Sequence, residues 1–456
     1  MNIVLRENLR LTAVPDTIRE TLVERLSLIN PKWVENHRMG RWNRGTPKIL
    51  RYYDRVRGGL WIPRGYLRQL LLLCRREGIG HNLEDRRRTL DPIDFTFQGR
   101  LKPFQQTAAA KMLQKDFGTL SAPTGSGKTV IALSLIARRR QPTLVIVHTK
   151  DLARQWVQRI ETFLGIPEAE VGFVGAGKKR VGQRVTVALV QSLYKCAEDI
   201  SPRIGFLVAD ECHRCPSRTF TEAVAAFDSR YMLGLTATPW RRDRLSKLIF
   251  WHLGDVHHRV DSEQLVESGD VLAAEVCYRE TDFRPYHDPV NEYSKMLTEL
   301  TADDRRNRLI ADDVAEAVRS GGGTCLVLSD RKAHCETLQA LLRYRHDIPC
   351  ERLTGDLTDA QRSEVVERLE RGEVKVLVAT GQLMGEGFDC RELSTLFLAT
   401  PIRFSGRVLQ YLGRVLRPAP GKRKARVFDY VDVHVEVLCA AARARRRVYE
   451  GKEQGA

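Results

Sequence analysis

The stretch APTGSGKTVIALSLIARRR, Ala122–Arg140, decides the fold. Its first eight residues match the pattern of a phosphate-binding loop, which joins a strand to the start of a helix. Gly125 and Gly127 let the backbone turn so that successive N–H groups point at phosphate oxygens. The helix that follows adds the positive end of its dipole. The stretch therefore predicts a strand–loop–helix unit that binds a phosphorylated ligand.

Outward from this loop, short apolar runs alternate with helix-like segments over most of the chain. Such runs are typical of parallel strands that are buried on both faces. With a helical segment between successive runs, the pattern predicts βαβ units. Two groups of runs indicate two α/β domains with parallel sheets. The first group is Thr143–Thr149, Val185–Val190, Arg203–Asp210 and Tyr231–Thr238, and the second is Thr324–Asp330, Cys350–Asp356, Val374–Gly381 and Leu393–Pro401.

The composition restricts the class of protein and of partner. The 456 residues include 74 Lys and Arg against 57 Asp and Glu, a net charge of +17, and such a surplus favours a polyanionic partner. No run approaches the ~18–20 apolar residues of a membrane-spanning helix, and the start lacks the apolar core of a signal peptide. The ten cysteines do not have the spacing of a disulfide framework. We therefore expect a cytoplasmic protein with reduced thiols and no membrane contact.

The N-terminal part of the chain differs from the rest. Residues 1–90 hold 19 Lys and Arg against 9 Asp and Glu, and helical patterns cover Thr17–Ile29 and Arg64–Arg76. Basic and aromatic side chains together suit nucleic acid, by phosphate neutralisation and base stacking. Alternatively, the aromatic residues form the core of a small domain. We expect a basic DNA-engaging domain over residues 1–95, an ATP-binding domain over 96–262 and a second α/β domain over 263–456. The aromatic residues in question are Trp42, Tyr52, Tyr53, Trp61 and Tyr66.

A second part of the phosphate site is LVADECHR, Leu207–Arg214, in which a buried run delivers two acids at its carboxyl end. Open α/β sheets bind ligands at this edge. We expect Asp210 to hold Mg²⁺, directly or through water, and Glu211 to orient and deprotonate an attacking water. In the loop, Lys128 would reach the β- and γ-phosphates and Thr129 would offer its hydroxyl to Mg²⁺. The predicted cofactors are ATP and Mg²⁺.

Four motifs follow one another along the chain, and their order is informative. They are TGSGKT (Thr124–Thr129), DECH (Asp210–His213), LTATP (Leu235–Pro239) and QYLGRVLR (Gln410–Arg417). With them the chain resembles a superfamily 2 helicase of the DExH type over about residues 98–420. DECH and the last motif look most like the branch of XPB and the type III restriction subunits, which acts mostly on DNA. The resemblance implies two RecA-like domains in tandem and ATP hydrolysis that depends on nucleic acid.

The resemblance also implies roles for individual residues. Gln105, or less favourably Gln106, would recognise adenine, unless it only begins a helix. His213, Thr236 and Thr238 would couple hydrolysis to domain movement, with packing as the alternative role of His213. Further contacts to the nucleotide would come from Thr124, Gly125, Ser126, Gly127, Lys128, Thr129, Gly387 and Asp389. Contacts to nucleic acid would come from Thr149, Lys150, Gln191, Ser192, Thr380 and Gly381.

The motif near the C-terminus resembles an arginine-finger motif. Gln410, Arg414 and Arg417 are four and three residues apart, so they share one face of a helix. A guanidinium is planar and permanently charged, which suits the charge on a transferring phosphate. Together with Glu211 these residues form the predicted catalytic set. They would reach ATP when the cleft between the α/β domains closes.

These features predict an ATP-dependent DNA helicase or translocase. Its partner would be single-stranded, duplex or branched DNA, and a nuclease is a candidate protein partner. Two alternatives stay open: an RNA-directed DExH helicase, and a nucleotide-gated clamp that binds nucleic acid without processive movement. Glu211, Arg414 and Arg417 argue against the clamp, because a pure binder does not need an acid that activates water.

Overall fold

The computed structural model describes residues 1–214, 218–237, 245–321, 323–381, 392–402, 408, 411–413, 415–419, 422 and 424–450. The chain divides into two compact units, which we describe separately. The first comprises residues 1–122 and 127–260, and the second comprises residues 261–456 together with the short segment 123–126. Among the described residues, no helix has the length and apolar character that crossing a membrane would require.

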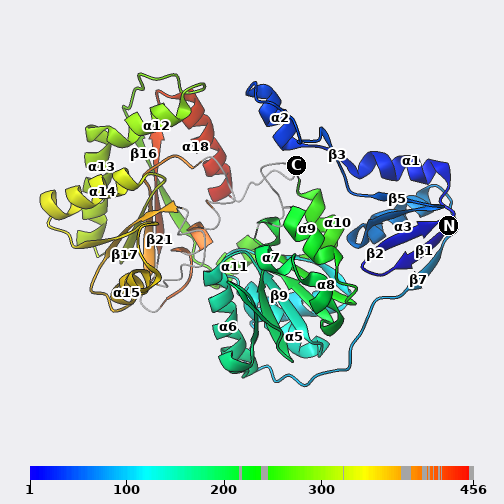
Figure 1. The fold of residues 1–456 in the computed structure, drawn as a ribbon. Helices are drawn as coiled ribbons and strands as arrows, with labels where there is room; N and C mark the ends of the chain where they lie inside the picture. The colour runs from blue at the N-terminus through cyan, green and yellow to red at the C-terminus, as the bar shows by residue number, and fades with distance from the viewer. Residues whose placement is uncertain are drawn as a thin grey trace. The chain divides into compact units, whose positions relative to one another are not determined.

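An eight-stranded sheet forms the centre of the first unit (Figure 1). Neighbouring strands run parallel, except for the antiparallel pair β10 and β11. Every residue of β9 and β12 is buried, as the continuous apolar runs predicted. In order across the sheet, the strands are β11 (Lys178–Arg180), β10 (Gly172–Gly175), β12 (Val185–Leu189), β9 (Thr143–Val147), β13 (Phe206–Ala209), β14 (Tyr231–Thr236), β8 (Phe117–Ser121) and β15 (Val256–Arg259).

Helices cover both faces of this sheet, since residues of both parities in its strands are buried. Leu144 and Ile146 of β9 belong to the core under α7, α9 and α10, while Val145 between them is equally buried on the opposite face. The helices of this sheet are α4 (Pro103–Leu113), α5 (Lys128–Arg139), α6 (Lys150–Leu164), α7 (Val190–Leu193), α8 (Ala197–Ile200), α9 (Arg218–Ala225) and α10 (Lys247–Leu253).

The N-terminal part of the first unit has a sheet of its own. In order its strands are β5 (Asp54–Val56), β6 (Gly59–Pro63), β2 (Asn8–Thr12), β1 (Asn2–Leu5) and β7 (Asn82–Asp85), and α1 (Asp16–Arg25) and α3 (Leu67–Arg76) share its core. The helix predicted over Thr17–Ile29 ends early, because Ser27–Ile29 forms β3 and pairs with β4 (Ile49–Arg51). Between β3 and β4 lies α2 (Pro31–Arg38).

This N-terminal part shares its core with the large sheet. Leu248 and Trp251 of α10 belong to the N-terminal hydrophobic cluster. The buried guanidinium of Arg64 donates from Nη1 to the carbonyl oxygens of Phe227, at 3.1 Å, and Ser229, at 2.9 Å. A Cβ atom on Gly65 would lie 2.3 Å from a backbone oxygen of α10, so only glycine fits there. The two parts are therefore docked closely against each other.

The second unit contains a six-stranded sheet in which all neighbouring strands are parallel. The predicted α/β fold with two mainly parallel sheets is thus confirmed, while the predicted boundary of an N-terminal domain near residue 95 stays a prediction. In order, the strands are β16 (Ala274–Thr281), β21 (Ala425–Asp432), β20 (Leu393–Leu398), β17 (Thr324–Ser329), β19 (Val376–Thr380) and β18 (Cys350–Leu353). Its helices are α11 (Ser262–Glu267), α12 (Tyr293–Ala302), α13 (Asp304–Arg319), α14 (Lys332–Ala340), α15 (Asp359–Glu370) and α18 (Glu436–Tyr449).

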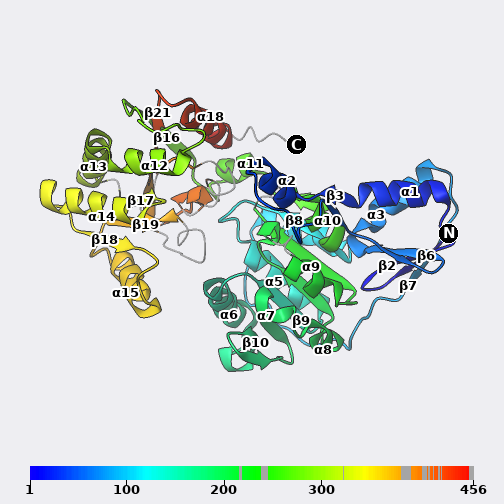
Figure 2. The ribbon, with the colours of Figure 1, turned by 45° about the horizontal axis from the view of Figure 1, so that its top comes forward.

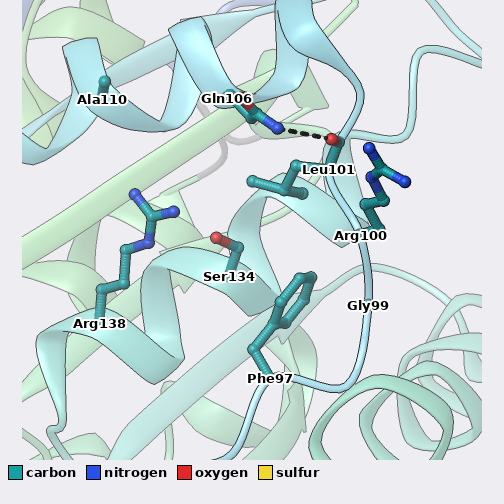
Figure 3. Close-up of a pocket in the computed structure, with 8 residues that line it drawn as sticks. All are labelled: Phe97, Gly99, Arg100, Leu101, Gln106, Ala110, Ser134 and Arg138. Carbon is teal, nitrogen blue, oxygen red and sulfur yellow. Dashed lines mark hydrogen bonds between the residues drawn. The ribbon is translucent and has the colours of Figure 1, made fainter.

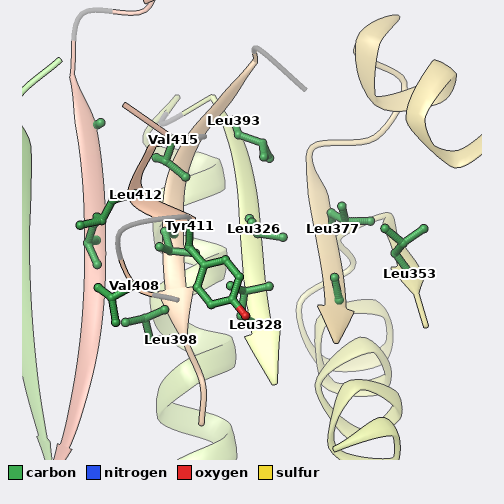
Figure 4. Packing of buried hydrophobic residues seen from close by; sticks show 14 of the residues in the cluster. Leu326, Leu328, Leu353, Leu377, Leu393, Leu398, Val408, Tyr411, Leu412 and Val415 are labelled. Carbon is green, nitrogen blue, oxygen red and sulfur yellow. The ribbon is translucent and has the colours of Figure 1, made fainter. Parts of the chain in front are cut away.

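Residues from the C-terminal motif pack into the core of this sheet. Tyr411, Leu412 and Val415 are buried in the same cluster as Leu328 and Leu398, as Figure 4 shows. The hydroxyl of Tyr411 donates to the carbonyl oxygen of Gly381, at 2.7 Å. The apolar side chains of this motif therefore fix it to the second unit.

Candidate nucleotide and nucleic-acid site

The predicted site residues of the first unit lie at one edge of its sheet. In parallel strands all carboxyl ends meet at the same edge. The phosphate loop follows β8, Thr236 ends β14, and Asp210 and Glu211 follow β13 on the next strand across. The predicted nucleic-acid contacts follow β9 and β12, which come next. The residues predicted to contact the nucleotide and those predicted to contact nucleic acid thus lie on neighbouring strands at one edge of the sheet.

The phosphate loop has the backbone conformation that its glycines predict. Gly125 and Gly127 adopt φ angles of 89° and 80°, in the left-handed region that glycine tolerates. Ser126 Oγ donates to the carbonyl oxygen of Pro123 at 2.7 Å. Lys128 begins α5 and is buried, and its Nζ donates to the carbonyl oxygen of Ala122 at 3.2 Å. The ammonium group is therefore held inside the loop, beside the helix terminus that favours anions.

Gln105 contacts this loop, which bears on the choice between two neighbouring glutamines. A Cβ atom on Gly127 would lie 2.5 Å from Gln105 Nε2, so the amide group packs directly against the glycine. Its Oε1 also accepts from the N–H of Lys102 at 3.0 Å, which caps α4. Helix capping and contact with the loop are thus combined in one side chain, and the role of Gln105 in adenine recognition stays a prediction.

Gln106 points elsewhere, into a hollow beside the start of α4 (Figure 3). Its Nε2 donates to the carbonyl oxygen of Leu101 at 3.0 Å. The hollow is also bordered by Ser134 and Arg138 of α5 and by Phe97. This placement favours Gln105 over Gln106 as the glutamine of the nucleotide site.

Asp210 is a buried carboxylate with two N–H donors. Its Oδ1 accepts from the N–H of Glu211 at 2.8 Å, and its Oδ2 accepts from Trp156 Nε1 at 2.8 Å. Burial, together with the charge of Glu211, raises the pKa of Asp210 above its ordinary value. No sequence pattern indicates a role for Trp156. The indole lies seven residues after Thr149 on α6, and only the fold brings it to Asp210.

Glu211 occupies a strained position next to Asp210. Its φ angle of 46° is rare for a residue with a side chain, and such strain clusters at functional sites. Burial by itself would raise the pKa of Glu211, but the charge of Lys128 and the nearby imidazole of His213 outweigh it and lower that pKa. Glu211 is therefore held as a carboxylate, the form that a general base requires.

His213 links Glu211 to the end of β14. Its Nδ1 lies 3.2 Å from Glu211 Oε2 and 3.1 Å from Thr236 Oγ1. His213 and Thr236 are both buried. The structure thus brings together two of the three residues predicted to couple hydrolysis to movement. The third, Thr238, lies outside the described residues.

The donors at this edge fit a nucleotide with a divalent cation. A carboxylate and a hydroxyl are oxygen ligands of the kind that Mg²⁺ prefers, and Asp210 and Thr129 supply them. Asp210 is 4% exposed, and a bound cation would compensate its desolvated charge. Lys128 supplies the cation expected beside phosphate oxygens. The residues therefore fit ATP and Mg²⁺.

The predicted nucleic-acid contacts of the first unit differ in exposure. Thr149 is the N-cap of α6, and its Oγ1 accepts from the N–H of Leu152 at 3.3 Å. Lys150 and Gln191 are exposed, while Ser192 is half-buried. The cap therefore fixes the start of α6, so that Lys150 is presented to solvent at the edge of the sheet.

In the second unit, Thr380 is the last residue of β19 and Gly381 follows it, at the carboxyl edge of the sheet. A Cβ atom on Gly381 would lie 2.6 Å from the Tyr411 hydroxyl and 3.0 Å from Asp330 Oδ1, which excludes a larger residue. Arg331 and Thr354, which come shortly after β17 and β18, lie at the same edge, and no sequence motif indicates them. Short strand-end turns carry no motif strong enough to identify them.

The predicted arginine fingers are only partly described. Arg417 is half-buried in the second unit, and its carbonyl oxygen accepts from Lys422 Nζ at 2.8 Å. Its catalytic role stays a prediction. The remaining predicted residues Gly387, Asp389, Gln410 and Arg414 lie outside the described residues.

Two family models match the chain. Residues 98–241 match the res subunit of the type III restriction enzyme, and residues 308–419 match the conserved C-terminal domain of helicases. The first match contains the phosphate loop and the Asp210–Glu211 pair, and the second ends just after Arg417. The motifs that defined the site are thus contained in the two matches.

Known relatives cover most of the chain. A DNA 3'-5' translocase, XPB2, of Sulfurisphaera tokodaii is 26% identical over 351 residues, which are 70% of this chain and 78% of that protein. A putative ATP-dependent RNA helicase, L396, of Acanthamoeba polyphaga mimivirus is 26% identical over 376 residues, 78% of this chain and 69% of that protein. A fragment of a putative HsdR subunit of a type I restriction enzyme from Vibrio vulnificus shares the fold, with a TM-score of 0.56 and 17% identity over 76% of this chain and 66% of that fragment.

Proposed function

Since this chain belongs to the superfamily 2 helicases, most similar to their XPB and type III restriction-subunit branch, we propose that it couples DNA-stimulated ATP hydrolysis to movement along DNA or to its opening. It is an ATP-hydrolysing helicase that acts on nucleic acid.

The arrangement around Glu211 is the observation that carries the proposal. Lys128 and His213 lower the pKa of Glu211, so a carboxylate is available to deprotonate water beside the phosphate loop. His213 also contacts Thr236 at the end of the next strand. A clamp that binds without turnover needs neither feature. The geometry therefore supports hydrolysis coupled to movement over the clamp.

Residues of the phosphate loop, the start of α5 and the end of β13 would bind Mg²⁺ and the phosphates. Asp210 and Thr129 would hold Mg²⁺, which neutralises charge on the phosphate oxygens. Lys128 would contact the β- and γ-phosphates, and Gln105 would contact the adenine. Arg414 and Arg417 are the arginines proposed to act on the transferring phosphate, and nucleic acid would engage the strand ends at Lys150, Gln191 and Thr380.

DNA is favoured over RNA by the branch that the chain most resembles and by the DNA 3'-5' translocase among its relatives. RNA is the second candidate, because another relative is named a putative RNA helicase. The deciding experiment measures steady-state ATP hydrolysis with single-stranded, duplex and forked DNA and with RNA of the same sequences. We expect stimulation by at least one form of DNA. Stimulation by RNA alone would assign the chain to RNA, and no stimulation by either would overturn the proposal.

A further inference from the structure

Residues 27–51 form an arm on the N-terminal part of the chain, here called the basic arm. The antiparallel pair of β3 and β4 closes its base, with Ser27 opposite Arg51 and Ile29 opposite Ile49. Figures 1 and 2 show α2, the helix of the arm, lying away from the small sheet of β1, β2 and β6. The arm therefore has one attachment and one free end.

Polar side chains, not a hydrophobic core, hold the arm in shape. Helix α2 has no buried residue. Asn30 caps it, accepting from the N–H of Lys32 at 3.0 Å and donating to the carbonyl oxygen of Pro47 at 2.8 Å. Asn43 donates to the carbonyl oxygen of Trp33 at 3.2 Å and accepts from Asn36 at 3.1 Å. The loop after α2 is thus tied back to the helix at Asn43 and at Pro47.

Trp42 lies at that tip and is 86% exposed. The other aromatic residues of the N-terminal sequence differ: Tyr66 is 1% exposed and packs edge-on against Trp251, while Tyr52 and Tyr53 pack on the N-terminal core. The two alternatives left open by the sequence therefore divide by residue. Tyr66 serves the core, and Trp42 does not. An indole exposed to this extent stabilises nothing within the described residues and is available to a ligand.

The surroundings of Trp42 are strongly basic. The arm contains six Lys and Arg residues against the single acid Glu35. Across the parts of the chain that the structure describes, none of the six forms an ion pair with a carboxylate. The six are Lys32, Arg38, Arg41, Arg44, Lys48 and Arg51. Lys48 instead lies over the ring of Trp33, with Nζ 5.2 Å from the centroid. Charge that no acid neutralises favours a polyanion.

We propose that the basic arm binds single-stranded DNA, with Trp42 stacked on an unpaired base and with Arg41 and Arg44 on the phosphates at either side. This inference rests on the proposed action on DNA and specifies where a single strand is held. Every base has a flat face on which an indole can stack without regard to sequence. Inside a duplex those faces are covered by neighbouring base pairs, so the arm selects unpaired strands.

A protein partner fits the arm less well. Protein–protein interfaces are enriched in Trp and Arg but depleted of Lys. The arm adds Lys32 and Lys48 to the exposed arginines Arg41 and Arg44 and has only one acid, and a charge surplus of this size favours a polyanion. The combination of an isolated aromatic ring and flanking cations is the one found in grooves for single-stranded nucleic acid.

The test compares Trp42→Ala and Trp42→Phe with the matched control Tyr344→Ala, a change at an 89% exposed aromatic residue of the second unit. Affinity of the full chain is measured for oligo(dT) and for a blunt duplex. Trp42→Ala should weaken binding of oligo(dT) by about 5- to 150-fold, the range that the stacking of one base contributes. Trp42→Phe should retain most of the affinity, and duplex binding should change little. Oligo(dT) affinity of Trp42→Ala equal to that of Tyr344→Ala would overturn the inference.

A second comparison separates stacking from charge. An abasic strand of equal length keeps every phosphate and removes every base. The wild-type chain should prefer oligo(dT) to the abasic strand, and Trp42→Ala should lose that preference; an unchanged preference would contradict stacking. Changing both Arg41 and Arg44 to Ala should reduce the slope of log K against log salt by about 1.4, because each phosphate neutralised on a single strand contributes about 0.7. ATP hydrolysis of the wild-type chain with DNA tests the proposed function separately, since that function can hold when the arm does not bind.

Discussion

Trp156 Nε1 donates a hydrogen bond to Asp210 Oδ2 at 2.8 Å. Trp156 lies on α6, which begins at Lys150, directly after its N-cap residue Thr149. We expect nucleic acid to bind at Thr149 and Lys150. Asp210 is the predicted ligand of Mg²⁺. The bond therefore joins the helix that carries a predicted nucleic-acid contact to the predicted ligand of Mg²⁺, and a shift of α6 on binding DNA would move a donor of Asp210.

Changing Trp156 to Phe should therefore reduce the response to DNA. Phenylalanine keeps an aromatic ring in this buried position but removes the donor to a charged group, an interaction of about 1.5–3 kcal/mol. We expect DNA-stimulated ATP hydrolysis to fall by about tenfold, while hydrolysis without DNA changes less. Trp61→Phe, at a half-buried site in the N-terminal part, is the control. Equal stimulation in both variants would show that the bond is only structural.

Changing Glu211 to Gln should stop turnover while preserving binding. The amide is nearly isosteric but cannot accept the proton of water, so hydrolysis should fall by about 10²- to 10⁴-fold. Affinities for ATP and DNA, measured separately, should stay close to those of the wild-type chain. Glu168→Gln, at an exposed position, controls for loss of charge. Stimulated turnover near the wild-type level in Glu211→Gln would remove Glu211 from the catalytic set.

A structural feature could be predicted from the sequence where residues close together along the chain determine it. The run Thr143–Thr149 identified β9 because a strand covered on both faces is apolar throughout. Strand β16 lies at the sheet edge, and its residues before Thr281 are exposed or half-buried, so it has no such run. Neither β16 nor its neighbour β21 was predicted from the sequence. Phosphate-loop residues were identified because their chemistry is local.

Contacts between distant residues could not be predicted in this way. The bond from Trp156 to Asp210 spans 54 residues, and no local pattern marks it. The same holds for the aromatic residues of the N-terminal part. Trp42 and Tyr66 have similar basic neighbours in sequence, yet one is exposed and the other buried, because only Tyr66 faces α10. Burial is decided by which segments pack together.

Lys128 and Arg417 should affect different steps. Lys128 is buried in the phosphate loop, so Lys128→Ala should weaken ATP binding itself. Arg417 belongs to the second unit, and we expect it to act on the transition state, so Arg417→Ala should slow hydrolysis, by up to about 10³-fold, with a smaller loss of ATP affinity. Nucleotide affinity and DNA-stimulated turnover are measured for both variants. Weak binding with full turnover at saturating ATP in Arg417→Ala would contradict its assignment as a finger.

Stability should fall on acidification because of the buried His334. Its Nε2 lies 2.8 Å from Asn307 Oδ1 and its Nδ1 lies 2.9 Å from Ser329 Oγ. Burial, assisted by the charge of Arg306, lowers the pKa of His334 to about 3. The unfolded chain takes up this proton near pH 6.5, whereas the folded chain does not until about pH 3. The contribution of His334 to the free energy of unfolding is therefore fully present above about pH 6.5. It decreases by about 1.4 kcal/mol for each pH unit as the pH falls toward 3.

The measurement is denaturant unfolding of the intact chain at pH 7.5 and pH 5. The free energy of unfolding should be higher at pH 7.5 than at pH 5. In His334→Gln, whose side chain cannot titrate, this difference should be smaller by about 2 kcal/mol. His81→Gln, at an exposed position, should keep the wild-type difference. An unchanged pH dependence in His334→Gln would show that His334 is already protonated in the folded chain.

Docking of the N-terminal part should depend on Arg64. Its buried guanidinium satisfies the carbonyl oxygens of Phe227 and Ser229, and Arg64→Met would fill similar volume but leave both acceptors without this donor. An unsatisfied buried acceptor costs about 1–3 kcal/mol. Arg68→Met is the matched control, because Arg68 spans the same interface in an exposed ion pair with Asp255 worth at most about 1 kcal/mol.

We therefore expect Arg64→Met to lower the free energy of unfolding by about 2–4 kcal/mol and Arg68→Met by less than about 1 kcal/mol. Deleting residues 1–95 should be more damaging still, because it uncovers Leu248 and Trp251 of α10. Exposed apolar surface of this kind promotes aggregation. A folded, monomeric deletion variant would show that the N-terminal part is a separable appendage. If the deletion variant folds poorly but the full-length chain with only Trp42 changed folds normally, the structural role and the DNA-binding role of the N-terminal part belong to different side chains.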